Sequence, residues 1–373
     1  MKHIIIAVGA LLATAPLDKA AAAPTLITAL DGTFQGKLDP TLTVREFLGL
    51  RYAQPPTGEQ RWKSPQPVAP ASGTQDATHH ANHCPQLGFP TFYESFGNPS
   101  VTEDCLFLNV FTPDDDRDNQ RPVIVLIHWS GNSVGESDEY DATKLVRQGR
   151  VVVVTINYRL GRLGFYANPA LTAESPDHTS GNYGIEDQQA ALKWVQRNIA
   201  AFGGDPDRVT IFGEDILTNV VSPTAKGLFH RAIVESGGLF TLPTLAQREA
   251  AGVNFATSVG CNLPTATQVL SCLRALSVSQ LLNSFSPNVD GKIVTQQIAA
   301  ALANGQFNQV PLMNGSNHDE YRFFVGIDFD LLGGGPLTAA AYPTVIAQTV
   351  GNASAPAVRR NTRSPVSPVR TWR

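Results

Sequence analysis

The sequence predicts an α/β protein with a mostly parallel central sheet flanked by helices. Residues Val123 to Ile127 form a continuous apolar run, which is typical of a strand buried on both faces. Between Ile185 and Phe202, apolar side chains recur every three or four positions, which predicts an amphipathic helix. A further apolar run, Val209 to Phe212, follows after a short connection. Strand, helix and strand in this order favour parallel pairing.

The remaining elements follow in order. Residues 25–44 contain two glycines and read as an opening β-hairpin, whereas 49–70 is rich in Pro and Gly and reads as an irregular surface segment. Further strands are predicted at Leu106–Phe111 and Val151–Ile156.

Gly203-Gly204 ends the long helix, and we expect Asp205-Pro206 to turn the chain into the next strand. Helical pieces are predicted within 244–282, a short helix at Ile298–Leu302 and a strand end at Val310–Met313.

The composition is that of a globular enzyme. The chain has 373 residues, of which 42% are hydrophobic and 16% charged, enough for a large core. Its net charge of -4 indicates no nucleic-acid-binding surface.

The N-terminus reads as a secretory signal peptide over 1–23. Lys2 and His3 precede an apolar stretch from Ile4 to Ala15, and Ala20 to Ala23 offers a cleavage zone. The apolar stretch is too short to span a bilayer, so no integral membrane segment is predicted and the protein is expected to be secreted or periplasmic.

The cysteines agree with export. The four cysteines, Cys84, Cys105, Cys261 and Cys272, allow three disulfide pairings, and buried free thiols are the alternative. The sequence has no CxxC pair, so we expect neither a metal site nor a cofactor.

The strand at Val209–Phe212 leads into a glycine, as a strand does before the nucleophile elbow of an α/β-hydrolase. The elbow pattern is G-x-S-x-G, but this chain has Gly213-Glu214-Asp215-Ile216-Leu217. Aspartate therefore occupies the serine slot, and Leu217 replaces the second glycine.

Many segments, in order over about 26–350, resemble the type B carboxylesterases, the family that includes the cholinesterases. They are Phe47-Leu48-Gly49-Leu50-Arg51-Tyr52-Ala53, Thr102-Glu103-Asp104-Cys105-Leu106-Phe107-Leu108-Asn109-Val110, Asn157-Tyr158-Arg159-Leu160-Gly161, Gly181-Asn182-Tyr183-Gly184, Ala200-Ala201-Phe202-Gly203-Gly204-Asp205-Pro206 and Gly227-Leu228-Phe229. The resemblance implies an α/β-hydrolase domain over 24–357 and the disulfides Cys84–Cys105 and Cys261–Cys272.

The resemblance also implies an activity, hydrolysis of small-molecule carboxylic esters through a serine acyl-enzyme. It assigns Glu320 as the triad acid, although an exposed loop carboxylate is the alternative. The oxyanion donors would be the backbone N–H groups of Ser130, Gly131 and Ile216. Trp129 and Ser130 place side chains where the family has glycines.

The nucleophile and the base are the parts that depart from the family. Only six residues separate Asp215 from Ser222, so residues of the elbow and its helix are missing relative to the family. Asp215 could act as a nucleophile itself, but the lost glycine argues against it. No histidine follows Glu320, where the base is expected.

A second G-x-S-x-G occurs at Gly131-Asn132-Ser133-Val134-Gly135. A nucleophile elbow needs a helix directly after it. A polar loop, Glu136 to Asp141, follows instead, so Ser133 is only an alternative nucleophile.

The last residues, 358–373, contain five arginines and no acidic residue, which predicts a disordered basic tail. The abrupt change in composition motivates the hypothesis of a premature end or frameshift in a longer ancestral frame. The fold would then be incomplete at the C-terminus, with an open sheet edge.

Three functional hypotheses result. The first is a carboxylesterase relative with impaired or no catalysis. The second is a noncatalytic binding or adhesion module on the same fold. The third is an active esterase that uses Ser133 or Asp215.

Overall fold

The computed structural model describes residues 25–39, 41, 43–88, 97–115, 120–129, 131–213, 216–318, 335, 337–350 and 356. The signal peptide and the basic tail predicted from the sequence lie outside these residues. The chain divides into two units, Met1–Gly315 and Ser316–Arg373, and each is treated by itself. In the second unit, the described helix is α11 (Tyr342–Val350).

The first unit contains all the described strands. They are β1 (Leu26–Ala29), β2 (Gly32–Gln35), β3 (Lys37–Asp39), β4 (Val44–Arg51), β5 (Thr74–Asp76), β6 (Phe107–Pro113), β7 (Arg121–Ile127), β8 (Val152–Ile156), β9 (Gly204–Gly213), β10 (Arg231–Glu235) and β11 (Leu312–Gly315).

Its helices lie between and after these strands. They are α1 (Thr143–Gly149), α2 (Gly161–Phe165), α3 (Pro169–Glu174), α4 (Tyr183–Asn198), α5 (Ile216–Val221), α6 (Leu245–Ser258), α7 (Ala266–Ala275), α8 (Val278–Leu281) and α9 (Ile298–Ala303), with short 3-10 turns at Ser137–Glu139 and Ile199–Phe202 among others.

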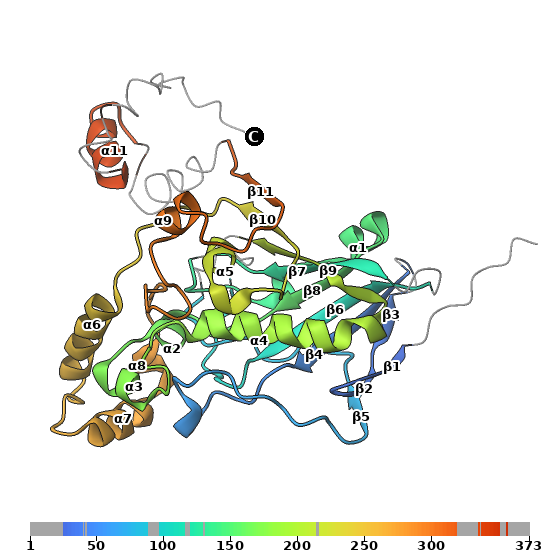
Figure 1. The fold of residues 1–373 in the computed structure, drawn as a ribbon, viewed down its shortest axis with the longest axis horizontal. Coiled ribbons are helices and arrows are strands. Elements are labelled where there is room, and N and C mark those ends of the chain that lie inside the picture. Colours follow the sequence, from blue (N-terminus) through green and yellow to red (C-terminus); the bar gives the residue numbers. More distant parts are fainter. Residues whose placement is uncertain are drawn as a thin grey trace, which may run out of the picture. The chain divides into compact units, whose positions relative to one another are not determined.

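The main sheet has the strand order β11-β10-β9-β7-β8-β6-β4-β3 (Figure 1). The five strands from β11 to β8 pair in parallel, and the strands from β6 to β3 are antiparallel to their neighbours. β1, β2 and β5 form a separate small sheet, in which the predicted hairpin is β1–β2. The predicted α/β class with a mostly parallel sheet is confirmed.

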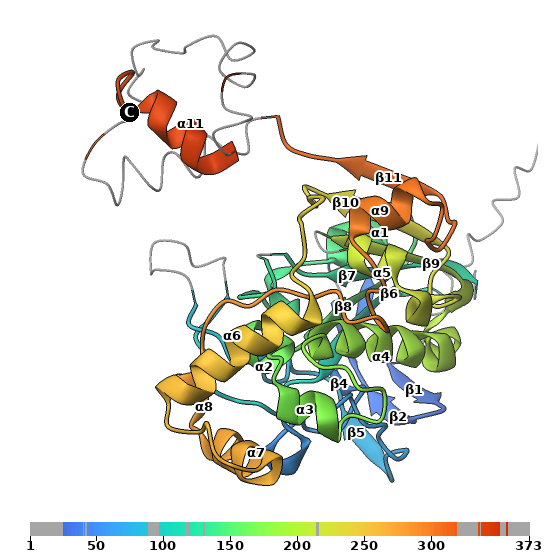
Figure 2. The same cartoon turned by 60° about the vertical axis from the view of Figure 1, so that its left-hand side comes forward.

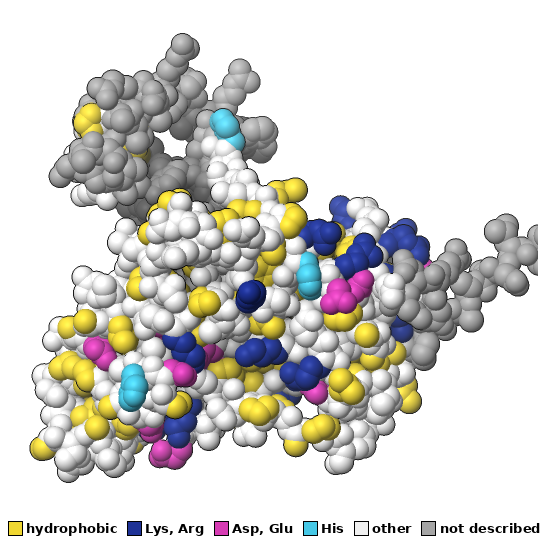
Figure 3. Space-filling view, in the orientation of Figure 1, with side chains coloured by type: hydrophobic (Ala, Val, Ile, Leu, Met, Phe, Trp, Pro, Cys, Tyr) yellow, Lys and Arg dark blue, Asp and Glu magenta, His cyan; other side chains and the backbone are white. Residues whose placement is uncertain are grey.

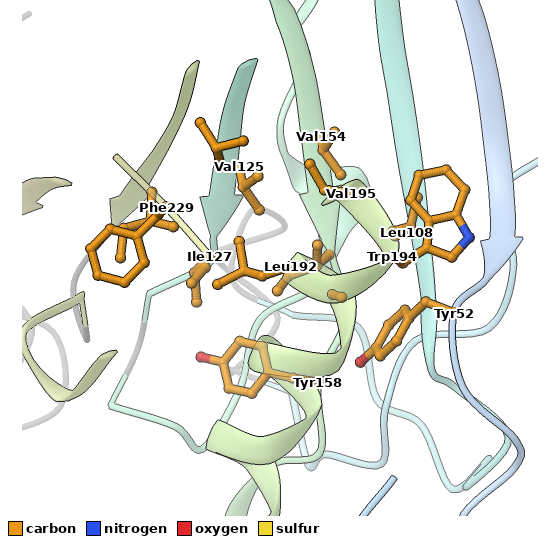
Figure 4. Packing of buried hydrophobic residues seen from close by; sticks show 14 of the residues in the cluster. Tyr52, Leu108, Val125, Ile127, Val154, Tyr158, Leu192, Trp194, Val195 and Phe229 are labelled. Carbon is orange, nitrogen blue, oxygen red and sulfur yellow. The ribbon is translucent and has the colours of Figure 1, made fainter. Parts of the chain in front are cut away.

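Helices cover both faces of the main sheet. Val152 and Val154 of β8 pack into the large core under α4 and α5, whereas Val153 packs into a smaller core with Val146 of α1. This alternation follows from the two-residue period of a strand. In Figure 4, side chains of α4 such as Leu192 and Val195 lie against the side chains of β7 and β8.

Helix α4 confirms the long amphipathic helix, and a 3-10 turn at Ile199–Phe202 extends it. Gly203 has a φ of 83° and ends this turn, as a glycine at a helix C-terminus does. The predicted turn at Asp205-Pro206 is wrong, since both residues lie within β9. They form a bulge there, because the register between β7 and β9 shifts from Arg121–Gly204 to Val123–Val209.

A second core joins α3, α6 and α7 (Figure 2). The disulfide Cys261–Cys272 ties the end of α6 to α7, and Cys84–Cys105 ties the segment before Gln86 to the start of β6. Both pairings implied by the family resemblance are therefore confirmed.

Basic and acidic side chains are interspersed on the face shown in Figure 3. Within the described ranges, none of the helices is both long and apolar enough to cross a membrane.

Candidate active site

The candidate active site lies where β7 and β9 end. The two strands are parallel neighbours, and Ile127 at the end of β7 stands beside Gly213 at the end of β9. The loop of residues 128–142, hereafter the oxyanion loop, and the turn into α5 therefore leave the same edge of the sheet. Carboxyl ends of parallel strands are where α/β proteins place their ligands.

β9 ends at Gly213 and α5 begins at Ile216, on either side of the predicted nucleophile elbow. Gly213 has a φ of 147°, and a Cβ at this position would lie 2.1 Å from the carbonyl oxygen of Ile127. Only glycine fits such a close approach. Glu214 and Asp215 lie outside the described residues, and α5 begins directly after them at Ile216. The strand and the helix that flank an elbow are therefore present.

Helix α5 is short and buried along its whole length. Leu217, which stands where the family has a glycine, is only 5% exposed and belongs to the main core. Buried polar groups fix the end of the helix: the side-chain amide of Asn308 donates to the carbonyl oxygens of Asn219 (3.2 Å), Val220 (3.1 Å) and Ser222 (2.8 Å). These bonds satisfy the carbonyl groups that a helix leaves unpaired at its C-terminus.

The oxyanion loop starts with a turn after β7. Gly131 has a φ of 60°, and a Cβ there would meet no atom within 4 Å. A side chain at this position would therefore meet no neighbouring atom. Ser130 lies outside the described residues, and Trp129 is 38% exposed.

Long-range hydrogen bonds anchor the rest of the oxyanion loop. The side-chain amide of Gln86 accepts from the backbone N–H of Gly135 (2.7 Å) and donates to its carbonyl oxygen (3.1 Å). Asn157 accepts from the N–H of Ser137 at 2.8 Å. The N–H of Gly161, at the start of α2, donates to the carbonyl oxygen of Asn132 at 2.7 Å.

A polar cluster lies around Glu136 and Asp138 of the loop. The ligand-type atoms of His83, Glu136 and Asp138 lie within 4.8 Å of one another. The carboxylate oxygens of Glu136 already accept hydrogen bonds from Asn98. In addition, Nδ1 of His83 lies 3.2 Å from Oε2 of Glu136. The Glu136 carboxylate therefore works as an anchor. Burial raises the pKa of the neighbouring Glu139 to about 7, and the charges of Glu136 and Asp138 add to the rise.

His128 is the imidazole nearest in sequence to the predicted oxyanion donors. It is buried, its ring stacks on Tyr158 with centroids 4.4 Å apart, and Nδ1 lies 3.4 Å from the carbonyl oxygen of Trp129. Burial lowers the pKa of His128 to about 4. The ring is therefore neutral near pH 7 and is packed as part of the loop.

A cavity of about 400 Å³ opens beside the loop. Gly131, Ser133 and Val134 line it on one side, and its other walls are residues 85–88, 160–163 and 281–284. The hydroxyl of Ser133 donates to the carbonyl oxygen of Gly131 at 3.2 Å. A 3-10 turn follows at Ser137–Glu139, and α1 does not begin until Thr143. Ser133 therefore lacks the helix that an elbow serine needs, as the sequence indicated.

The structure thus places some of the predicted site residues and omits others. Gly131 lines the cavity and Ile216 begins α5. Asp215, Ser130 and Glu320 lie outside the described residues, so their roles remain predictions. Sequence reasoning missed the anchors Gln86 and Asn308, because no local pattern marks a partner that is 49 or 86 to 89 positions away.

Comparison with known proteins agrees with this geometry. The family model described as "Carboxylesterase family" matches residues 22–334. The chain belongs to this carboxylesterase family.

Relatives in this family carry names of ester-hydrolysing enzymes. The chain is similar to pyrethroid hydrolase Ces2e of Rattus norvegicus, with 39% identity over 79% of this chain and 54% of that protein. It is similar to fumonisin B1 esterase of Sphingopyxis macrogoltabida, with 38% identity over 75% of this chain and 54% of that protein.

A third relative is para-nitrobenzyl esterase of Bacillus subtilis (strain 168), with 37% identity over 77% of this chain and 62% of that protein. The chain spans a little over half the length of these relatives.

Proposed function

We propose that this chain provides the ester-binding site of a carboxylic ester hydrolase. The observation that carries the proposal is the cavity of about 400 Å³ beside the oxyanion loop, where Gly131 lines the wall with no atom in the space that a side chain would fill. A carbonyl oxygen can approach a backbone N–H only where no side chain intervenes. The esterase names of the relatives support the same reaction class.

The reaction would follow the acyl-enzyme route. A nucleophile attacks the ester carbonyl, and the N–H groups of Ser130, Gly131 and Ile216 stabilise the oxyanion. Glu320 would be the acid of the triad, but this sequence has no histidine after it to serve as the base. Asp215 stands in the nucleophile slot, and a carboxylate there gives an acyl anhydride in place of an acyl serine. We therefore expect turnover by this chain to be slow compared with a serine esterase.

An active esterase that uses Ser133 is the second candidate. It is favoured by the position of Ser133 in the cavity wall. Against it, no histidine forms a hydrogen bond with Ser133 within the described part of the chain, and a hydroxyl without a base is a weak nucleophile. A noncatalytic binding module is the third outcome that an experiment must separate.

One experiment distinguishes the three. The mature chain is checked for folding, assayed with p-nitrophenyl butyrate and labelled with a fluorophosphonate, and ester binding is measured by NMR with dimethyl succinate. We expect binding of the ester, slow turnover and no label at Ser133. Ser133→Ala is compared with Ser72→Ala, an exposed serine outside the cavity.

Each result has one meaning. Fast turnover with a label at Ser133, both lost in Ser133→Ala and kept in Ser72→Ala, would establish the second candidate. Ester binding without any turnover would support the third outcome, a noncatalytic binding module. A folded chain that neither binds nor hydrolyses esters would refute the proposal.

We also propose that the protein matures in an oxidising compartment after removal of residues 1–23. The two buried disulfides support this, because such bonds persist where thiols are not kept reduced. N-terminal sequencing of exported protein tests it, and a product that still carries residues 1–23 would contradict it.

A further inference from the structure

Two arginines on either side of the second core face no carboxylate. Arg162 of α2 is 7% exposed, and its guanidinium carbon lies 3.8 Å from the ring centre of Phe255 and 5.3 Å from that of Phe285. The guanidinium carbon of Arg248 in α6 lies 4.9 Å from the same Phe285 ring. Among the described residues, neither arginine forms an ion pair.

Several other buried arginines of this chain face a carboxylate, although Arg45 donates to the backbone carbonyl oxygen of Pro113. Arg159 pairs with Asp187 at 2.7 Å, and Arg61 pairs with Glu103 at 2.5 Å. Arg162, which is buried, and Arg248, which is half-buried, differ from Arg159 and Arg61 in this respect.

Burial leaves these two charges poorly compensated. It lowers the pKa of Arg162 and is the sole cause of the lowered pKa of Arg248. The Nε atoms of both side chains are buried without a hydrogen-bond partner. Nη2 of Arg248 donates to the hydroxyl of Ser286, which is a neutral partner. Nη1 of Arg162 reaches only the carbonyl oxygens of Gln280 and Leu281, at 3.4 and 3.5 Å. Stacking on aromatic rings offsets only part of the cost of an unpaired buried charge.

The location connects these donors to the candidate site. Arg162 lines the cavity that Gly131 and Ser133 line from the oxyanion loop, and Ser284, next to Phe285, lines it as well. A ligand in this cavity would therefore have its ester group near the loop and another part near Arg162. Guanidinium groups bind planar oxyanions through paired hydrogen bonds.

We propose that the cavity selects carboxylic esters that carry a second, ionised carboxylate, which Arg162 binds directly and Arg248 attracts from behind Phe285. This inference rests on the proposed function, because it names the class of ester that the same site takes.

The test compares two esters of equal chain length in a binding assay that needs no turnover. Monomethyl succinate carries a carboxylate at neutral pH, and dimethyl succinate does not. We expect the wild-type protein to bind the monoester about tenfold more tightly at low salt, as for one charge-assisted pair. The monoester should also raise the Tm of the wild type.

Substitutions assign the effect to the two arginines. Arg162→Met should abolish the preference, Arg248→Met should reduce it, and Arg162→Lys should retain part of it, since lysine keeps the charge but not the planar fork. Arg147→Met, at an exposed arginine of α1, is the matched control and should change nothing. In the absence of ligand, the Tm of Arg162→Met should be no lower than that of the wild type. If Arg162 had only a structural role, this substitution would lower the Tm.

The outcomes separate this inference from the proposed function. If dimethyl succinate binds but the monoester gains nothing, the carboxylate site is refuted and the ester site stands. If the preference survives Arg162→Met, or is lost equally in Arg147→Met, Arg162 is not its source and the inference fails. If neither ester binds, the proposed function itself fails.

Discussion

The oxyanion loop after β7 and the turn after β9 leave the same edge of the sheet, but they are held in different ways. Side chains from distant segments, above all Gln86, hold the oxyanion loop through hydrogen bonds. The end of β9 requires glycine, because a Cβ at Gly213 would lie 2.1 Å from the carbonyl oxygen of Ile127, and Asn308 holds the far end of α5. The loop after β7 and the two ends of the segment from Gly213 to α5 are therefore held by separate contacts.

The largest expected effect is at the turn. Gly213→Ala places a Cβ against the Ile127 carbonyl oxygen, 2.1 Å away, at a φ of 147°. We expect a loss of about 4 kcal/mol or more in the free energy of unfolding, measured by urea denaturation. Gly227→Ala is the control, because its φ is 79° but no atom lies within 4 Å. Equal losses in the two variants would show that the Ile127 carbonyl oxygen does not exclude a side chain at position 213.

The end of α5 is the next most sensitive point. Asn308→Asp replaces an amide donor by a carboxylate that faces three carbonyl oxygens. The expected loss at pH 7 is about 3 kcal/mol, from urea denaturation. Asn254→Asp, at an exposed site on α6, should be nearly neutral. If Asn308→Asp is also neutral, the side chain does not hold α5.

On the oxyanion loop, Gln86→Ala removes both bonds to Gly135 and leaves its buried N–H and carbonyl groups unpaired. We expect a loss of about 2 kcal/mol and weaker binding of dimethyl succinate. Gln148→Ala, an exposed glutamine of α1, should change neither quantity. Reduced stability with unchanged ester binding would show that the hydrogen bonds of Gln86 stabilise the loop but do not affect ester binding in the cavity.

The smallest effect concerns Glu139. Its pKa rises from 4.5 to about 7 on folding, so the folded state favours the protonated form. This contribution is fully present below pH 4.5 and is lost as the pH rises through about 7. Glu139→Gln should therefore stabilise the protein by about 1 kcal/mol at pH 8 and have little effect at pH 4. The value at pH 8 is small because Glu139 is partly exposed to solvent. Thermal unfolding at both pH values measures it, and a variant less stable at pH 8 would contradict the assignment.

The sequence was sufficient for the features that depend on local pattern. The apolar run at Val123–Ile127 became β7, and the apolar repeat of Ile185–Phe202 became α4 with its 3-10 extension. The family resemblance supplied both disulfide pairings. The predicted turn at Asp205-Pro206 was wrong, because β9 continues through these residues as a bulge in its pairing with β7. Turn-forming residues alone do not reveal such pairing.

The candidate site could be predicted only in part. Gly131 and Ser133 were found from their motif, and both line the cavity. The anchors Gln86 and Asn308 depend on contacts between segments far apart in the chain. Arg162 follows directly on the Asn157–Gly161 motif, but only the fold shows that Phe255 and Phe285 surround it.

The bond between Cys84 and Cys105 has a consequence for where the site can work. It fixes the chain two residues before Gln86 to the start of β6, and Gln86 in turn holds Gly135 of the oxyanion loop. Reduction would release this tether and free the segment that carries Gln86 to explore more conformations. The ambient thiol potential would thereby determine how well the oxyanion loop is held, and the proposed ester binding would then depend on the compartment in which the protein resides.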